Sequence, residues 1–313
     1  MLPLTFAVDP GAKMVAMLDD LLTEGRNPAS EGIDALPAVD ILAIVNAEDR
    51  KVADAVGREI PRIAQAVDAI AARLEKGGRL FYIGAGTSGR LGVLDAAECA
   101  PTFNVPPDLV QGIIAGGEPA LARAIEADED DAALGARDLD ARGFTPADAL
   151  VGIAASGRTP YVLGAVAHAR QLGALTIGIS CTPGSELSAA VEIPIEPLAG
   201  PEVIAGSTRM KAGTATKLVL NMLSTAVMIR LGHVYGNLMV NVQPANAKLR
   251  DRAIRIVAEA GGADPERAER LLDASGGTVK TAIVMARLGI AREAAEERLR
   301  AARGRVSEAL KHG

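Results

Sequence analysis

Two short segments of the chain combine glycine with hydroxyl side chains at a spacing suited to binding phosphate. The first, GAGTSGR, covers residues 84–90, and the second, ASGRTP, covers residues 155–160. Each follows an apolar run and precedes an amphipathic stretch, so glycine lets the backbone approach a ligand while a helix N-terminus offers free N–H groups. The hydroxyls of Ser88, Ser156 and Thr159 add further donors. Together the two segments predict a site for a compact ligand with one phosphate and several hydroxyls.

The first segment also fits a dinucleotide-binding loop. Gly84, Gly86 and Gly89 match the pattern G-x-G-x-x-G. That spacing alone is weak evidence, and Glu118, the acid that could meet a ribose, comes later than the ~20 residues usual for this fingerprint. The additional hydroxyl residues and the second SGR segment favour a phosphosugar over a dinucleotide.

Carboxylates that could act on such a ligand occur in two places. Glu98 lies in AAEC, at the expected end of the helix that follows the first segment, and EADEDD occupies residues 126–131. Both also have a plain interpretation, as a solvated helix end and as an acidic turn or N-cap. If carboxylates from the two places met over a sugar phosphate, they could serve as acid and base. Cys99, beside Glu98, is expected to be a packed side chain rather than a nucleophile.

An alternation of element types predicts an α/β fold around these segments. Apolar, largely β-branched runs occupy residues 79–86, 108–117, 149–157, 175–181 and 191–196, and amphipathic stretches at 89–99, 118–142 and 160–172 separate most of them. This pattern indicates a parallel sheet covered by helices, in which ligands bind beyond the carboxyl ends of the strands. The glycine- and serine-rich ends of the runs therefore belong to one edge of the sheet.

Helical periodicity is expected on both sides of the sheet-forming region. It extends over residues 12–75, and it returns after about residue 250 as short helices with glycine joints. We therefore predict a domain of residues 1–250, including the N-terminal helices, and a small helical domain of residues 251–313. The apolar run 218–232 is broken by polar residues, which favours a core helix over a membrane span.

Composition excludes several classes of function. The chain has 313 residues, 2% aromatic residues, no Trp and a net charge of -6, which disfavours nucleic-acid binding. A local group of N–H donors can still bind a small anion. Three scattered His and two Cys give no metal-ligand cluster. The low Cys count fits a reducing cytoplasm, and the N-terminus lacks the pattern of a signal peptide.

Longer segments around these motifs closely resemble the N-acetylmuramic acid 6-phosphate etherase family, which shares its core with the animal glucokinase regulatory proteins. In chain order the matching segments are TEGRNPAS, GAGTSGRLGVLDAAECAPTF, GIAASGRTPYV, GPEVIAGSTRMKAGTATKLVLNMLST, GNLMVNVQPANAKL and VKTAIVM. The resemblance implies a sugar isomerase (SIS) fold, an αβα sandwich with a small helical domain at its end. It also implies a cytoplasmic homodimer that cleaves the lactyl ether of N-acetylmuramate 6-phosphate without metal or nucleotide.

The resemblance also assigns roles to residues. Glu98 matches the glutamate that protonates the departing lactate, and Glu129 matches a second catalytic glutamate, the expected base. Such an acid needs a raised pKa, so we expect Glu98 to be partly desolvated. The sugar phosphate is expected to contact residues of both glycine-containing segments and of a loop that closes the site. These residues are Gly86, Thr87, Ser88, Gly89, Ser156, Gly157, Thr159, Ser207 and Lys211.

Three points stay open. Thr208 and Arg209 lie in the loop expected to close the site. Glu202 is a further candidate for a catalytic residue, one that would open the sugar ring. Two other functions remain, a phosphosugar isomerase and a sugar-phosphate-sensing regulator, although both candidate glutamates are retained, which speaks against pure binding. The C-terminal helices either cover the active site of a partner chain or only enlarge a dimer interface.

Overall fold

The computed structural model describes residues 22–125 and 127–311 and contains one five-stranded parallel sheet. Its strands stand in the order β2-β1-β3-β4-β5, so β2 forms one edge beside β1, and β3, β4 and β5 extend the sheet to the other edge. Their bounds are β1 Leu80–Gly84, β2 Val110–Ile114, β3 Ala149–Ile153, β4 Leu175–Ile179 and β5 Ile193–Ile195. All five lie in the runs expected to form strands, which are largely apolar because helices cover both faces of the sheet.

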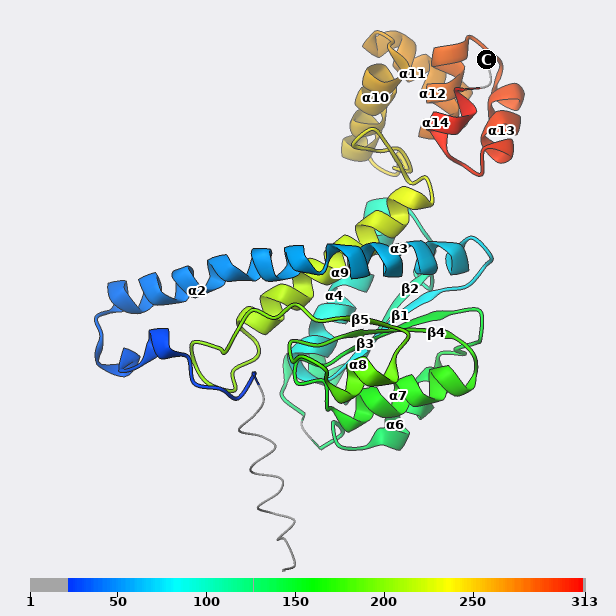
Figure 1. Cartoon of the computed structure of the whole chain (residues 1–313). Helices are drawn as coiled ribbons and strands as arrows, with labels where there is room; N and C mark the ends of the chain where they lie inside the picture. Colours follow the sequence, from blue (N-terminus) through cyan, green and yellow to red (C-terminus); the bar gives the residue numbers. More distant parts are fainter. Residues whose placement is uncertain (1–21, 126, 312–313) are drawn as a thin grey trace, which may run out of the picture.

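Helices cover both faces of the sheet (Figure 1). On one face lie α3 (Ile60–Leu74), α4 (Gly86–Phe103) and α9 (Lys211–Arg230), and on the other lie α6 (Ala132–Ala141), α7 (Pro160–Gln171) and α8 (Glu186–Ala190). A single turn, α5 (Pro119–Ala122), follows β2. Side chains alternate along β1, so Leu80 and Tyr82 join one hydrophobic cluster while Phe81 and Ile83 join the other. The fold is therefore the predicted αβα sandwich.

The helix α4 is longer than its sequence indicates. The sequence predicts an end near residue 99, but the helix continues through Pro101 and ends at Phe103, after which Asn104 takes a left-handed conformation with φ 49°. Proline removes one intrahelical hydrogen bond and crowds the preceding turn, and the helix ends two residues after Pro101. Glu98 is therefore inside the helix rather than at its end.

The N-terminal helices form an arm. After two single turns (η1, Pro28–Ser30, and η2, Ile33–Ala35), α2 (Ala38–Arg58) leads into α3, and the start of α2 projects beyond the sandwich (Figure 1). Only the second half of α2 is packed, through Val52, Ala55 and Val56. The part of the expected helical region that precedes residue 22 lies outside the described residues.

The helix α9 is the core helix expected from its sequence. It packs against α2, α3 and α4, and its buried residues include Val219, Leu220 and Leu223. Among the described helices it is the one long and apolar enough to cross a membrane by length and composition, and a buried helix of a globular core meets the same criterion.

A separate helical bundle follows a short hairpin of β6 (Val234–Tyr235) and β7 (Leu238–Met239), which the sequence did not indicate. Its helices are α10 (Ala247–Gly261), α11 (Pro265–Ala274), α12 (Val279–Leu288), α13 (Arg292–Ala301) and α14 (Val306–Ala309). They share a hydrophobic cluster that already includes Val240. The predicted boundary at residue 250 falls inside α10, so we place the proposed division into two domains near residue 240.

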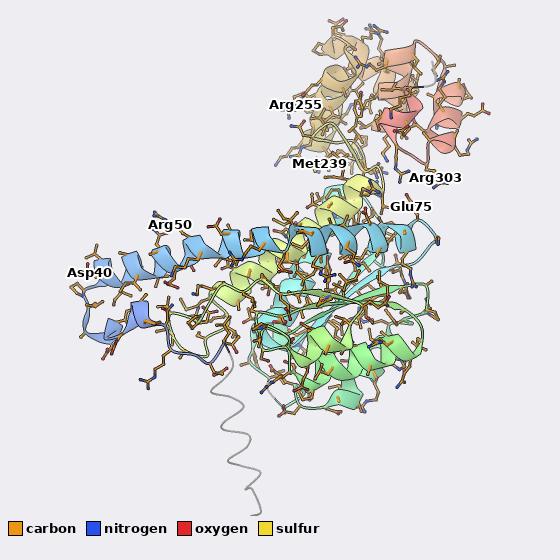
Figure 2. The ribbon with its side chains drawn as sticks, in the orientation of Figure 1. Asp40, Arg50, Glu75, Met239, Arg255 and Arg303 are labelled. Atoms are coloured by element: carbon orange, nitrogen blue, oxygen red, sulfur yellow. The ribbon has the colours of Figure 1, made fainter. Side chains whose placement is uncertain are left out.

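The bundle meets the sandwich at few points. Figure 2 shows Glu75, just after α3, and Arg303 of the bundle on the two sides of this joint, with Met239 close by. Glu75 pairs with Arg305 and, at 3.8 Å, with Arg303. The guanidinium of Arg305 also donates to the carbonyl of Arg230 at the end of α9.

Candidate active site

The first glycine-containing segment forms the junction between β1 and α4. Gly86, Thr87 and Ser88 belong to the first turn of the helix, not to a loop before it, and all three are half-buried. Gly86 has a φ of 51°, a conformation that favours glycine. The first turn of α4 therefore offers N–H groups and two hydroxyls at the carboxyl end of β1, as a phosphate site requires.

The second segment lies beside the first. Gly84 of β1 pairs with Ile153 of β3, so the connections after the two strands leave the sheet as neighbours. The Ser156 hydroxyl accepts the Arg158 N–H at 3.3 Å. Thr159 takes the N-cap position of α7, but its side chain makes no capping bond there.

Only glycine fits at position 157. Gly157 has a φ of 68°, and a Cβ there would lie 2.2 Å from the hydroxyl oxygen of Ser185. The backbone of this segment is thus held close to the next turn by packing, while Ser156 and Thr159 stay half-buried at its surface. The two SGR segments lie together at one edge of the sheet.

The acidic connection returns Glu129 to the same edge. Its backbone carbonyl accepts the Tyr161 N–H at 3.0 Å, which ties it to the start of α7. Its carboxylate Oε1 lies 3.4 Å from the position that a Cβ would take on Gly86. Asp131 instead caps α6 by accepting the Leu134 N–H, and this bond, with the guanidinium of Arg137, lowers its pKa. Within the described part of EADEDD, Glu129 approaches the glycine-containing segments and Asp131 has the plain capping role.

A third segment, residues 200–211, borders the first. A Cβ on Gly213, in the first turn of α9, would lie 3.5 Å from both the Thr208 carbonyl oxygen and the Thr87 methyl group. Ser207 is half-buried nearby in the sequence. The start of α9 and the start of α4 therefore lie side by side.

Comparison with known proteins identifies the family. An N-acetylmuramic acid 6-phosphate etherase of Aeromonas hydrophila subsp. hydrophila is 55% identical over 295 residues, which is 94% of this chain and 99% of the relative. The same enzyme of Rubrobacter xylanophilus is 55% identical over 296 residues, 95% of this chain and 98% of the relative. The chain belongs to the N-acetylmuramic acid 6-phosphate etherase family. Its members are carbon–oxygen lyases.

Two further matches concern the sandwich. Residues 62–170 of this etherase chain match the family model of the glucokinase regulatory protein N-terminal SIS domain. A solved phosphoheptose isomerase from Francisella tularensis is 23% identical, with a TM-score of 0.48, and covers 62% of this chain and 100% of its own. The SIS match agrees with the parallel sheet described above.

Glu98, the other expected catalytic glutamate, lies far from Glu129 within one etherase chain. It follows Gly86 by twelve residues of continuous helix, a rise of roughly 18 Å along the axis. Its side chain is exposed, so the expected desolvation is absent in the single chain. A single chain does not bring the two glutamates together.

Lys211 does not fit the predicted contact with substrate. Its side chain is 1% exposed, and its ammonium lies 2.7 Å from Glu48 Oε2 and donates to the Ala199 carbonyl at 3.0 Å. The charge is therefore neutralised inside the protein. Lys211 holds the first turn of α9 in place instead of reaching a ligand.

The carboxylate of Glu202, the candidate for ring opening, is already engaged in hydrogen bonds with the backbone. It is 2% exposed, and its two carboxylate oxygens accept the N–H groups of Lys211 and Ala212, both at 2.9 Å. A carboxylate at this place satisfies N–H groups that have no partner within the helix, and it interacts favourably with the positive end of the helix dipole. Glu202 therefore satisfies the first N–H groups of α9 from outside the helix, while Met210 occupies the N-cap position.

Sequence reasoning missed Glu48. This residue of α2 is buried and accepts hydrogen bonds from Lys211, from Lys51 and, at 2.9 Å, from Asn27. Burial alone would raise its pKa, but these bonds outweigh burial and lower the pKa from 4.5 to about 2. The available signal was its position, because Glu48 is in line with the apolar residues Val52 and Ala55 at helical spacing.

The thiols have no catalytic character. Burial, with the nearby charge of Asp95, raises the pKa of Cys99 to about 12, and burial with the charge of Glu202 does the same for Cys181. Both are therefore protonated at neutral pH. Among the described residues, no group of three or more His, Cys, Asp or Glu side chains is placed to hold a metal ion.

Proposed function

We propose that Glu129 and Glu98 are the base and the acid of the etherase reaction of this chain. The substrate is N-acetylmuramate 6-phosphate, and the products are N-acetylglucosamine 6-phosphate and D-lactate. The observation that carries the proposal is the approach of the Glu129 carboxylate to Gly86, at the start of the helix that offers Thr87 and Ser88. A base held there is next to any sugar whose phosphate occupies the first turn of α4.

The phosphate subsite is assigned to the two glycine-containing segments. Free N–H groups at the start of α4 favour an anion, whereas the start of α7 contributes the half-buried hydroxyls of Ser156 and Thr159. Close approach of the ligand to the backbone is possible where glycine leaves no side chain. The residues assigned to this subsite are Gly86, Thr87, Ser88, Gly89, Ser156, Gly157 and Thr159, and Ser207 is proposed to contact the sugar from the 200–211 segment.

The chemistry follows from opening of the sugar ring. The open form has an aldehyde at C1, which makes the proton on C2 acidic, and Glu129 removes it. The electron pair forms the C2–C3 double bond while the bond from C3 to the lactyl oxygen breaks, and Glu98 gives that oxygen a proton. Water then adds its hydroxyl to C3 and a proton returns to C2. General acid and base groups of this kind contribute typically 10²–10⁴-fold to a rate.

We further propose that the site is assembled between two copies of the chain. The distance along α4 separates Glu98 from the phosphate subsite of its own chain, whereas a two-fold related chain can supply the missing acid. The exposed position of Glu98 supports this proposal, because a side chain on the surface of one chain is free to enter the site of a partner chain. The assembly is a homodimer, and we expect it in the cytoplasm, where its free cysteines stay reduced.

The test is a D-lactate assay with purified protein and N-acetylmuramate 6-phosphate. The wild type should release lactate and N-acetylglucosamine 6-phosphate in equal amounts, and Glu98→Gln and Glu129→Gln should fold but lose at least ~10²-fold in kcat. Near-normal turnover by either variant would remove that residue from the mechanism. Formation of a ketose phosphate without lactate would indicate an isomerase instead.

Mixing the two inactive variants tests the shared site. After subunit exchange, half of the dimers contain one chain of each kind, and two-fold symmetry gives each of them one intact site, so activity should recover to roughly a quarter of the wild type. If both glutamates of a site came from one chain, the mixture would stay inactive.

A further inference from the structure

The substrate of the proposed reaction carries a second anion besides its phosphate. This is the carboxylate of the lactyl group, which the product sugar lacks. An enzyme that selects the lactyl ether needs a group that recognises this carboxylate, because binding of the phosphate and the sugar hydroxyls alone does not distinguish substrate from product. A cation close to the phosphate subsite would provide that selection.

Most cations near the subsite are already engaged. Lys211 is buried and paired with Glu48. The guanidinium of Arg90 donates to the carbonyls of Ala120, Leu121 and Arg123 at 2.9, 3.3 and 2.8 Å. Arg158 lies 3.7 Å from a carboxylate oxygen of Glu186.

Arg209 differs from these three cations. It is exposed, and in the part of the chain that the structure describes no carboxylate lies within ion-pair distance of it. It occupies the turn closed by the Met210 N–H and the Ser207 carbonyl at 3.2 Å. Its neighbour Thr208 approaches Gly213 on the same side as the Thr87 methyl group. Arg209 thus belongs to the turn whose residue Thr208 lies close to the start of α4, and its side chain is exposed.

The base of this turn is held firmly. The helix α9 begins immediately after this turn, and Glu202 accepts its first two N–H groups. The ammonium of Lys211, the first residue of the helix, is fixed by Glu48. Ser30 donates to the Val203 carbonyl at 2.7 Å, so the N-terminal segment supports the other end of the loop. A long side chain on a fixed base can reach a ligand without costly ordering of the backbone.

We propose that Arg209 binds the lactyl carboxylate and selects the substrate by it; this inference rests on the proposed function. A guanidinium matches a carboxylate with two parallel hydrogen bonds, which a lysine cannot do. The contact also assists the reaction. When the bond from C3 to the lactyl oxygen breaks, negative charge grows on an oxygen one carbon away from the carboxylate, and a cation on that carboxylate offsets the repulsion.

The experiment compares Arg209→Gln and Arg209→Lys with the wild type. The substrates are N-acetylmuramate 6-phosphate and its analogue with a lactamide in place of the lactyl carboxylate. The wild type should prefer the acid, and Arg209→Gln should lower kcat/KM for the acid by roughly 10- to 100-fold, the value of a charged hydrogen bond. For the amide, kcat/KM of Arg209→Gln should equal that of the wild type. For the acid, kcat/KM of Arg209→Lys should lie between the values of Arg209→Gln and the wild type.

Binding of N-acetylglucosamine 6-phosphate, measured by calorimetry, provides the second readout. This ligand has the phosphate and the sugar but no lactyl group, so its affinity should be the same in Arg209→Gln and the wild type. Arg26→Gln is the matched control, because Arg26 is an exposed arginine on the segment that packs against the same loop. It should leave both readouts unchanged.

Three results would overturn the inference. The first is a full preference for acid over amide in Arg209→Gln. The second is an equal loss of affinity for N-acetylglucosamine 6-phosphate in that variant. The third is loss of the preference in Arg26→Gln. Each would assign the carboxylate to another group or Arg209 to the phosphate. Failure of the proposed function is separate, since it would show as absence of lactate release by the wild type.

Discussion

At the scale of single residues, the pair of Lys211 and Glu48 makes a sharp prediction. Replacing Lys211 by Met leaves the Glu48 carboxylate buried without its main partner, and loss of one partner of a buried pair costs roughly 3–5 kcal/mol. We therefore expect a lower free energy of unfolding in urea, with lactate release per folded molecule largely kept. The double variant Glu48→Gln/Lys211→Met should recover part of the loss. Full stability with lost activity would return Lys211 to the substrate site.

The same pair predicts how stability depends on pH. The pKa of Glu48 is lowered in the folded protein from 4.5 to about 2, so its contribution is fully present above pH 4.5. It is lost as the pH falls from there toward 2, because the unfolded chain takes up the proton first, and the loss amounts to roughly 3 kcal/mol. Unfolding in urea at several pH values checks this, and in Glu48→Gln the fall over that interval should be smaller by the same amount.

At the scale of elements, the exposed half of α2 is the clearest unpartnered surface. Val39 and Leu42 are 71% and 66% exposed, although they lie on a long helix whose second half is packed. We expect the homodimer to cover them, so Val39→Glu/Leu42→Glu should give a monomer in light scattering. The same variant should lose lactate release, because each site would lack the Glu98 of its partner.

Charge changes on the same helix provide the control for the dimer prediction. Asp40 and Arg50 are exposed polar residues of α2 (Figure 2), and surface substitutions of this kind usually change stability by less than ~0.5 kcal/mol. Asp40→Asn and Arg50→Gln should therefore stay dimeric and active. A dimeric, active Val39→Glu/Leu42→Glu would exclude α2 from the interface.

The elements also show which parts of the site were predictable from sequence. Apolar runs and glycine positions predict the strands, the two SGR segments and their common edge. These signals are local, because each is formed by residues close together in the sequence. The buried pair does not, because Glu48 and Lys211 are 163 positions apart and each is an ordinary surface residue by type. The distance of Glu98 from the subsite does not depend on where the helix ends, because twelve helical residues separate it from Gly86 in either case. The expectation that Glu98 and Glu129 act together came from the family resemblance.

At the scale of the whole molecule, the sandwich and the bundle are two cores connected by a weak joint. The hydrophobic cluster of the bundle shares no residue with the two clusters of the sandwich. The carboxylate of Glu75 is the group that pairs with both Arg303 and Arg305, and all three side chains are partly exposed. Ion pairs of this kind contribute about 0–1 kcal/mol, so they orient the bundle more than they stabilise it.

We therefore expect Glu75→Gln to change the arrangement and not the stability. Its free energy of unfolding should fall by less than about 1 kcal/mol, while X-ray scattering in solution should give a broader distribution of distances between sandwich and bundle. Asp68→Asn is the control, since it removes an exposed ion pair with Arg230 that lies wholly within the sandwich, and it should leave the scattering unchanged. If Glu75→Gln instead lost several kcal/mol with unchanged scattering, the two cores would unfold as one unit and the joint would be part of it.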